Sequence, residues 1–363
     1  MTFAGVHAMK LWCGVAVLMS VLVAACALAA DDPVLLFERG QLRLAGQLCE
    51  QRLAANASDV NAKAILARVR AVEGRLDEAV PLAAAAAAAA PSNALAQFAY
   101  AEVCAEKAQS VSMLRAAGWA GKLKQAAEAT LAADPNSSDA LEMLIEFHLR
   151  APGIMGGDKK KATEYSARLE RVDPAAAWIR KAIAATRDKD TTLTAQYLAH
   201  AADVRPTSPR ALIQYASYLA PEYRDPAKAE QLALQAVELE PWRMSGWQLL
   251  AAIYAFQKRD DDLEKLLARA EGVDPTRLSP RYQAARQMVV MKRDPARAER
   301  YLRAYLARPA EFGAPSWGGA RWRLGLALEQ QGKKAEAVTE IELAVKLDPK
   351  LDEAKKDLKR LRG

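Results

Sequence analysis

The feature that most constrains this chain is a constant spacing of prolines in its second half. Pro241, Pro275 and Pro309 stand 34 residues apart, and each follows a helix-like run: AVELEP, AEGVDP and LARP. Because a proline inside a helix removes a backbone hydrogen bond and clashes with the preceding turn, each one is expected to separate two helices. A period of this length, with proline at the junction, predicts a repeated helix–turn–helix unit and therefore an all-α fold.

The residues inside the first interval resemble a known repeat. Trp247-x-x-Leu250-Ala251-x-x-Tyr254 is similar to the Trp-x2-Leu-Gly-x2-Tyr pattern of the tetratricopeptide repeat family, with Ala251 where glycine is usual. A second departure is Leu263, which stands where the family has a small residue. The resemblance implies an α-solenoid, a right-handed superhelix of about nine tetratricopeptide-like hairpins.

The repeats are expected to fill the chain from residue 31 to residue 363. Regular repeats are predicted over 207–349 and a polar capping helix over 350–363, whereas 94–206 holds extended or irregular repeats. Gly40 and Gly74 are again 34 residues apart, and each is expected to end the first helix of a hairpin in a left-handed conformation. Pro91 to Pro135 is ten residues longer than one period, so this third hairpin needs a longer first helix or an ordered loop.

Residues 1–30 differ from the rest and predict an export signal. Lys10 supplies a positive charge, Leu11 to Ala25 form an apolar run, and ACALAA follows with small residues before Asp31. This pattern is typical of a secretory signal peptide. Removal after residue 29 or 30 would leave an exported, periplasmic protein.

A second interpretation of the same segment is a lipid anchor. Val23-Ala24-Ala25-Cys26 resembles a bacterial lipobox, with valine where leucine is commoner. Lipidation of Cys26 would tether the protein to a membrane, and no other feature of the sequence predicts membrane association. Against this, only a handful of residues separate Cys26 from the first helix. The soluble exported form is the preferred prediction, and the lipoprotein stays open.

The charges do not predict nucleic-acid binding. The net charge is +7, but Lys and Arg alternate with Asp and Glu along the chain, as in RDDDLEKLLARAEG. A nucleic-acid interface needs a concentrated basic patch. Two cysteines, Cys49 and Cys104, remain after signal removal. Both fall at helix positions that favour buried thiols, although the sequence does not settle whether they pair.

No catalytic, metal or cofactor site is predicted. After the signal segment only His148 and His200 remain as histidines, and neither lies in a cluster with metal-ligand spacing. His148 is expected to be a hydrogen-bonded histidine of a helix. The pair Gly156-Gly157 before Lys159 lacks the spacing of a phosphate loop and is expected to form an interhelical turn, with a helix starting at Asp158.

Recognition of another molecule is therefore the predicted activity. In the family that the chain resembles, side chains of the first helix of each hairpin project into a concave groove that binds a peptide or protein segment. The aromatic and arginine residues among them are of types that dominate binding hot spots. The residues predicted to line the groove are Gln214, Tyr218, Gln248, Phe256, Tyr282, Arg286 and Trp322.

These observations predict a non-enzymatic exported scaffold that binds a protein or peptide partner in the cell envelope. Two alternatives remain open. One is a solenoid that binds a small molecule or glycan through its aromatic residues. The other is a membrane-tethered component of an envelope assembly or secretion complex, lipidated at Cys26.

Overall fold

The computed structural model describes residues 32–220, 224–309 and 314–363. These ranges contain α-helices, one 3₁₀ turn and short links, and no strand occurs in them. The predicted all-α fold is confirmed. The predicted signal segment with Cys26 lies outside the described residues.

The chain forms two compact units, Met1–Ser166 and Ala167–Gly363, which divide within helix α9. The described helices of the first unit are α2 (Pro33–Glu38), α3 (Leu42–Ala55), α4 (Val60–Val72), α5 (Leu76–Ala89), α6 (Ala94–Ser110), α7 (Met113–Ala133), α8 (Ser138–Arg150), η1 (Gly153–Met155) and the start of α9 (Lys159–Val172). Those of the second are the end of α9, α10 (Pro174–Arg187), α11 (Thr191–Val204), α12 (Pro209–Leu219), α13 (Pro226–Leu239), α14 (Met244–Gln257), α15 (Asp260–Val273), α16 (Ser279–Val290), α17 (Pro295–Leu306), α18 (Trp317–Gln330), α19 (Lys334–Leu347) and α20 (Asp352–Arg362).

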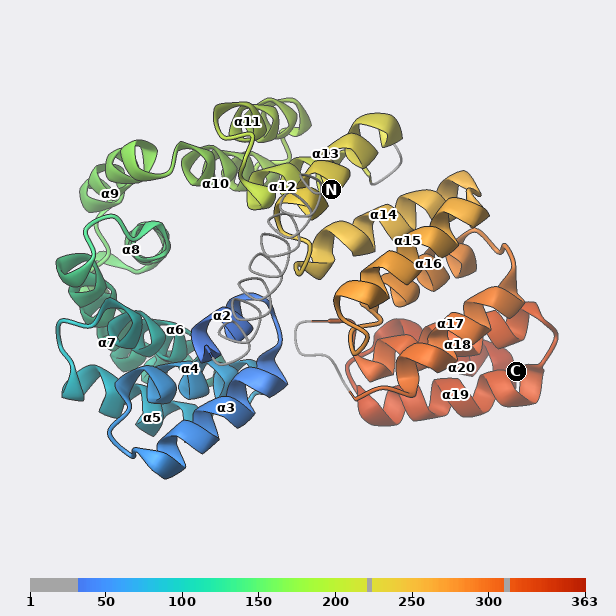
Figure 1. Ribbon diagram of the computed structural model, residues 1–363, viewed down its shortest axis with the longest axis horizontal. Helices are drawn as coiled ribbons and strands as arrows, with labels where there is room; N and C mark the ends of the chain where they lie inside the picture. The colour runs from blue at the N-terminus through green and yellow to red at the C-terminus, as the bar shows by residue number, and fades with distance from the viewer. Residues whose placement is uncertain (1–31, 221–223, 310–313) are drawn as a thin grey trace, which may run out of the picture. The chain divides into compact units, whose positions relative to one another are not determined.

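The helices follow one another as hairpins (Figure 1). We call the even-numbered helices α2 to α18 the A helices and the odd-numbered helices α3 to α19 the B helices. Along the described chain they make nine successive pairs, and α20 packs on α19 after the last pair. In the second unit α10, α12, α14, α16 and α18 each contact the next, so these A helices form a continuous row.

In several hairpins the turn between the two helices contains a residue with a left-handed backbone conformation. Gly40 and Gly74 have φ values of 74° and 75°, which confirms their predicted role, and Gly332 has 78°. Lys258 and Lys292 adopt the same backbone conformation, with φ of 61° and 51°. A residue with a Cβ pays a steric cost there that glycine avoids.

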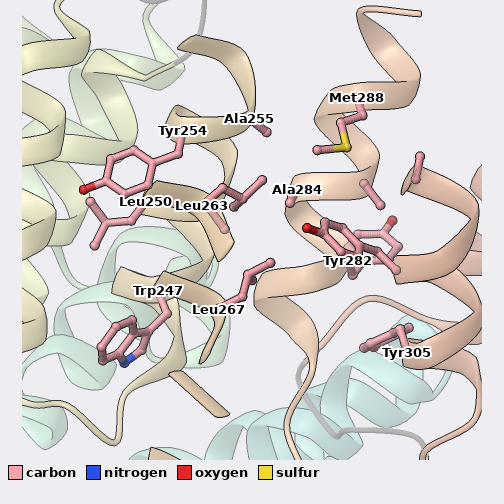
Figure 2. Packing of buried hydrophobic residues seen from close by; sticks show 14 of the residues in the cluster. Trp247, Leu250, Tyr254, Ala255, Leu263, Leu267, Tyr282, Ala284, Met288 and Tyr305 are labelled. Atoms are coloured by element: carbon pink, nitrogen blue, oxygen red, sulfur yellow. The ribbon is translucent and has the colours of Figure 1, made fainter. Parts of the chain in front are cut away.

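The core of the second unit is built from the residues that carry the family resemblance (Figure 2). Trp247 is 2% exposed, and its indole Nε1 donates a hydrogen bond to the Pro241 carbonyl oxygen at 2.8 Å. Tyr254 and Leu250 pack beside it, and Leu263, which replaces the usual small residue, is fully buried. Burial of each large apolar side chain contributes about 1.5–3 kcal/mol relative to its exposure.

The third hairpin accommodates its extra residues as helix. α6 has 17 residues and α7 has 21, and only Val111 and Ser112 link them. The ordered loop considered from the sequence is therefore absent between these helices, and Gly118 and Gly121 both lie inside α7. The alanines, leucines and lysines around them favour helix strongly enough to offset the cost of the two glycines, about 1 kcal/mol each.

The turn before α9 is formed as predicted. Gly156 has a φ of 87°, and a Cβ at Gly157 would lie 1.8 Å from the Ala151 carbonyl oxygen, so neither position accepts a side chain without rearrangement. Asp158 then caps α9, because its carboxylate accepts hydrogen bonds from the backbone N–H groups of Lys160 and Lys161.

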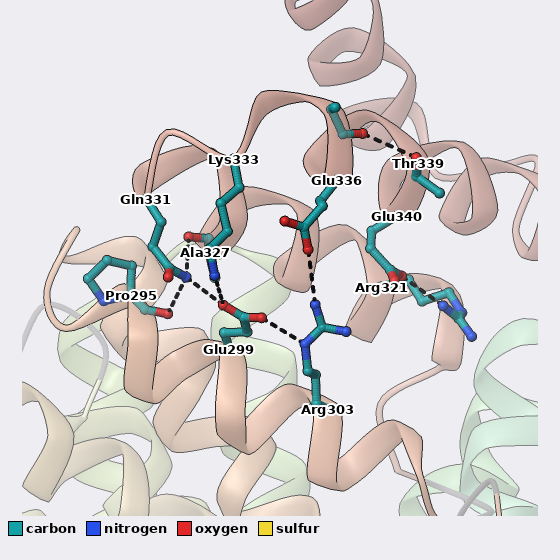
Figure 3. A network of polar contacts seen from close by, with 11 residues as sticks. Pro295, Glu299, Arg303, Arg321, Ala327, Gln331, Lys333, Glu336, Thr339 and Glu340 are labelled. Atoms are coloured by element: carbon teal, nitrogen blue, oxygen red, sulfur yellow. Dashed lines mark hydrogen bonds and ion pairs between the residues drawn. The ribbon is translucent and has the colours of Figure 1, made fainter.

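Polar contacts join successive hairpins at the repeat spacing (Figure 3). Glu299 of α17 accepts hydrogen bonds from Lys333 Nζ at 2.9 Å, Arg303 Nε at 2.7 Å and Gln331 Nε2 at 2.9 Å. Burial raises the pKa of the Glu299 carboxyl, but these three donors outweigh it and lower the pKa to about 2. The charged carboxylate therefore fastens α17 to the turn between α18 and α19.

Candidate functional site

Five of the seven predicted site residues occupy equivalent places on the A-helix row. Gln214, Gln248 and Tyr282 are spaced by one 34-residue period, on α12, α14 and α16. Tyr218 and Arg286 each lie four residues further along their helices, on the same side as Gln214 and Tyr282. The row therefore brings these positions onto one run of adjacent helices.

The side chains on α12 and α14 are accessible to different degrees. Gln214 is exposed, whereas Tyr218, Gln248 and Phe256 are half-buried. The Tyr218 hydroxyl donates a hydrogen bond to the Thr191 carbonyl oxygen at 2.7 Å, which fixes its ring across the neighbouring hairpin. Gln214 and Gln248 thus present amide groups, and Tyr218 and Phe256 present aromatic rings, on two consecutive A helices.

Tyr282 is a core residue and therefore does not belong to the candidate surface. Its side chain is 6% exposed and its ring packs on Tyr305 of α17, with centroids 5.4 Å apart (Figure 2). Gly319 on the next A helix lies close to the Tyr282 hydroxyl, because a Cβ built at Gly319 would be 3.8 Å from it. Arg286, one turn further along α16, is exposed.

Trp322 of α18 is half-buried and serves two contacts. Its indole Nε1 donates a hydrogen bond to Asp357 Oδ2 of α20 at 2.8 Å, so it attaches the capping helix. Its ring also carries the guanidinium of Arg323, whose carbon lies 4.0 Å from the ring centroid. Arg323 was not among the predicted site residues; its position directly after a selected tryptophan was the only signal for it.

We call the accessible set of residues the A-helix surface. It keeps six of the seven predicted residues, leaves out the buried Tyr282 and adds Arg323. Amide, aromatic and guanidinium groups together provide hydrogen-bond donors, acceptors and large rigid contact areas, which suit recognition of a polypeptide. The members of the A-helix surface are Gln214, Tyr218, Gln248, Phe256, Arg286, Trp322 and Arg323.

The two cysteines of the described chain are unreactive core residues. Cys49 on α3 and Cys104 on α6 are both buried and free. Burial raises the pKa of the Cys49 thiol to about 12 and that of Cys104 to about 11. A thiol needs its thiolate form to act as a nucleophile, so both are inert near neutral pH.

His148 lies on a helix as expected, but it is buried without a hydrogen bond, so the prediction of a hydrogen-bonded histidine is wrong. The side chain on α8 is 1% exposed, its ring stacks on Tyr165 at 5.8 Å, and neither ring nitrogen has a hydrogen-bond partner. Burial, and secondarily the charges of Lys124 and Lys161, lower its pKa, which favours the neutral imidazole. Among the residues that the structure describes, no group of three or more His, Cys, Asp or Glu could hold a metal ion.

None of the helices in the described ranges has the length and apolar character needed to cross a bilayer.

The repeat architecture now follows from the chain itself: hairpins at a 34-residue period, left-handed turns within them, and A helices in contact from one repeat to the next. The fold is that of a tetratricopeptide repeat array. No family model and no curated protein matches the sequence.

Solved structures similar to this tetratricopeptide array include two bacterial proteins and one from yeast. A thermophilic TPR protein of Thermus thermophilus is 17% identical with a TM-score of 0.42, covering 52% of this chain and 98% of its own. A tetratricopeptide repeat protein of Parabacteroides merdae is 14% identical with a TM-score of 0.46, covering 72% and 99%. Yeast Tom70 is 14% identical with a TM-score of 0.46, covering 93% and 88%.

Proposed function

We propose that this tetratricopeptide array is a non-enzymatic scaffold that binds a protein or peptide segment in the cell envelope through its A-helix surface. The observation that carries the proposal is the spacing of that surface. Amide, aromatic and arginine side chains recur on successive A helices without being buried in the core. Such residues on adjacent helices provide a binding strip along which an extended or helical segment can lie.

The packing of the repeats explains why this surface is available for binding. Each hairpin buries apolar side chains against its neighbours, and stability in such arrays is approximately a sum over adjacent repeats. Trp247, Leu250 and Tyr254 use the buried side of α14 for this purpose. Gln248 and Phe256 lie on the same helix but are only half-buried, so their substitution leaves the large buried side chains in place.

A substitution series on one hairpin tests the surface. We expect capture from envelope extract by the purified chain to retain a specific protein, and the double variant Gln248→Ala/Phe256→Ala on α14 to lose it. Lys265→Ala is the matched control, because Lys265 is exposed on α15, the B helix of the same hairpin. Equal retention by both variants would place binding elsewhere. No retained protein, together with a ligand-induced rise in melting temperature, would favour the small-molecule or glycan alternative.

Export is the second part of the proposal and rests on residues 1–30, with Lys10, the apolar run and the ACALAA motif. We expect mass spectrometry of the mature protein to find an unmodified N-terminus at Ala30 or Asp31. A diacylated or triacylated Cys26 would instead establish the membrane-tethered form. An intact Met1 in the cytoplasmic fraction would contradict export altogether.

A further inference from the structure

Arg286 of α16 and Arg323 of α18 differ from another arginine on each of these helices, which forms an ion pair. On α16, Arg281 Nε lies 2.5 Å from Glu271 Oε1, and on α18, Arg321 Nη1 lies 2.7 Å from Glu340 Oε2. These ion pairs join A helices to B helices within the array. In a repeat whose arginines are used in this way, an arginine without a carboxylate has charge available for another molecule.

Arg286 and Arg323 are such arginines among the residues that the structure describes. Arg286 is exposed on α16 and makes no ion pair. Arg323 is half-buried on α18, and its Nε is shielded from water without a hydrogen-bond partner. The charge of Asp357 reaches Arg323, but that carboxylate already accepts hydrogen bonds from Trp322 Nε1 and Arg360 Nη2, at 2.8 Å and 3.0 Å.

Arg323 is held in a defined orientation. Its guanidinium carbon lies 4.0 Å from the centroid of the Trp322 ring, and the hydrogen bond to Asp357 fixes that ring in turn. Contact with an aromatic face orients the planar guanidinium. Because Nε is shielded from water, the donors to a ligand are the terminal Nη groups. Less side-chain entropy is then lost on binding than for a freely rotating arginine.

The electrostatics of the pair also favour an anion. Burial lowers the pKa of Arg323, the positive charge of Arg286 lowers it further, and contact with the Tyr282 hydroxyl opposes these effects. Gly319 of α18 lies close to the Tyr282 hydroxyl of α16, and Arg323 and Arg286 each stand four residues further along these helices, so the two arginines occupy matching positions on adjacent A helices. An anion bound between two like charges relieves their repulsion. Carboxylates match the fork of N–H donors that arginine presents.

We propose that Arg286 and Arg323 form a binding site for the side chain of an aspartate or glutamate within a bound peptide segment. The A-helix row continues from the two arginines on one side, toward Phe256 of α14, whereas on the other side α18 is its last helix and α20 packs on α19 as the cap. A segment that lies along the A-helix surface and contacts Phe256 therefore places its acidic side chain at the capped end of the row. This inference rests on the proposed peptide-binding function and adds the chemistry of the partner.

Peptide selection on the purified, naturally processed chain tests the site without knowledge of the partner. A random dodecapeptide library displayed at the N-terminus of a phage coat protein contains no free C-terminal carboxylate, so acidic selection reports side chains. We expect wild type to enrich peptides with Asp or Glu at a fixed position, and Arg286→Gln/Arg323→Gln to lose that enrichment. Arg300→Gln is the matched control, since Arg300 is exposed and unpaired on the B helix α17.

Affinities of one selected peptide then quantify the site. Replacing its acidic residue by the amide is expected to weaken binding to wild type about 10–100-fold, the range for a hydrogen-bonded charged group. The same replacement should change binding to Arg323→Gln less than twofold. Amidation of the free C-terminus should also have less than a twofold effect, and a large loss on amidation would overturn the side-chain assignment.

The outcomes separate this inference from the function beneath it. Selection of peptides without acidic preference would overturn the arginine site and leave peptide binding intact. Selection of no peptide above background would overturn both. Because Arg323 is half-buried, the single variant Arg286→Gln, at an exposed position, repeats the test in a protein whose core is unchanged; acidic enrichment that survives in it at the wild-type level would refute the paired site.

Discussion

Replacing Gly325 on α18 by alanine is expected to loosen the last hairpin, although alanine is the better helix former. A Cβ at this position would lie 2.4 Å from Ile341 Cγ1 and 3.0 Å from the Ala337 carbonyl oxygen, both on α19. Ile341 is fully buried, so its side chain cannot rotate into open space. The substitution therefore forces the two helices apart or the isoleucine out of its rotamer.

The expected magnitude follows from two opposing terms. Helix propensity favours alanine over glycine by about 1 kcal/mol, whereas overpacking of a dense interface costs about 1–3 kcal/mol. With one contact below 3.0 Å and a backbone oxygen as the second neighbour, we take the upper part of that range. The net loss for Gly325→Ala is then about 1–2 kcal/mol.

Native-state hydrogen exchange of the α18 and α19 amides is the suitable assay, because it reports local opening free energies without assuming one global transition. Gly272→Ala on α15 is the control, since no atom lies within 4 Å of its added Cβ, and it should be neutral or stabilising by less than about 1 kcal/mol. Ile341→Ala should cost less in the Gly325→Ala background than in wild type, by about 1–2 kcal/mol. Stabilisation by Gly325→Ala, or additive costs in the double variant, would refute the close-approach argument.

Three further predictions concern single groups. The folded pKa of Glu299, about 2, lies below the ordinary 4.5, so its contribution to stability is complete above pH 4.5 and is lost as the pH falls toward 2. Glu299→Gln should lower the free energy of unfolding by about 1–2 kcal/mol at pH 7, a value discounted because Lys333 is partly exposed. Urea unfolding should show the stabilities of the two proteins converging near pH 2. For His148, whose folded pKa is lowered, stability is complete above the unfolded pKa of about 6.5 and falls below it, so His148→Phe should flatten the melting temperature between pH 5 and 7, and an unchanged slope would contradict this. Lys258→Gly should raise the melting temperature by relieving up to about 1 kcal/mol of left-handed strain, whereas Gly332→Ala should lower it.

The hairpin architecture was predictable because it is encoded locally and repeatedly. The proline interval and the left-handed glycines Gly40 and Gly74 recur at one period, and each has a direct conformational cause. Trp247 and Tyr254 could be placed in the core because their spacing puts them on one side of a helix. Lysines in the same left-handed turns, such as Lys258, could not be recognised, since nothing in a lysine indicates a positive φ.

The candidate surface was less predictable because its exposure depends on side chains of other helices. Gln214 and Tyr282 occupy equivalent positions one turn before Tyr218 and Arg286, yet Gln214 is exposed and Tyr282 is buried. The difference lies in Tyr305 of α17, whose ring packs on Tyr282. Burial at such a position is decided by a residue far away in sequence, and helical spacing alone cannot supply it.

The same dependence links the packing of the array to its proposed recognition chemistry. Trp322 was selected as a ligand-contacting aromatic, but its indole N–H holds Asp357 of the capping helix. By engaging that carboxylate, Trp322 leaves Arg323 without an ion-pair partner, and its ring lies against the guanidinium, whose carbon is 4.0 Å from the ring centroid. Trp322, which packs the capping helix at the end of the array, therefore also orients the neighbouring Arg323 and leaves its charge available for binding. Trp322→Phe, which keeps the ring and frees Asp357 to pair with Arg323, should therefore weaken acidic-peptide binding as Arg323→Gln does, whereas an unchanged affinity would show that the indole hydrogen bond plays no part in the site.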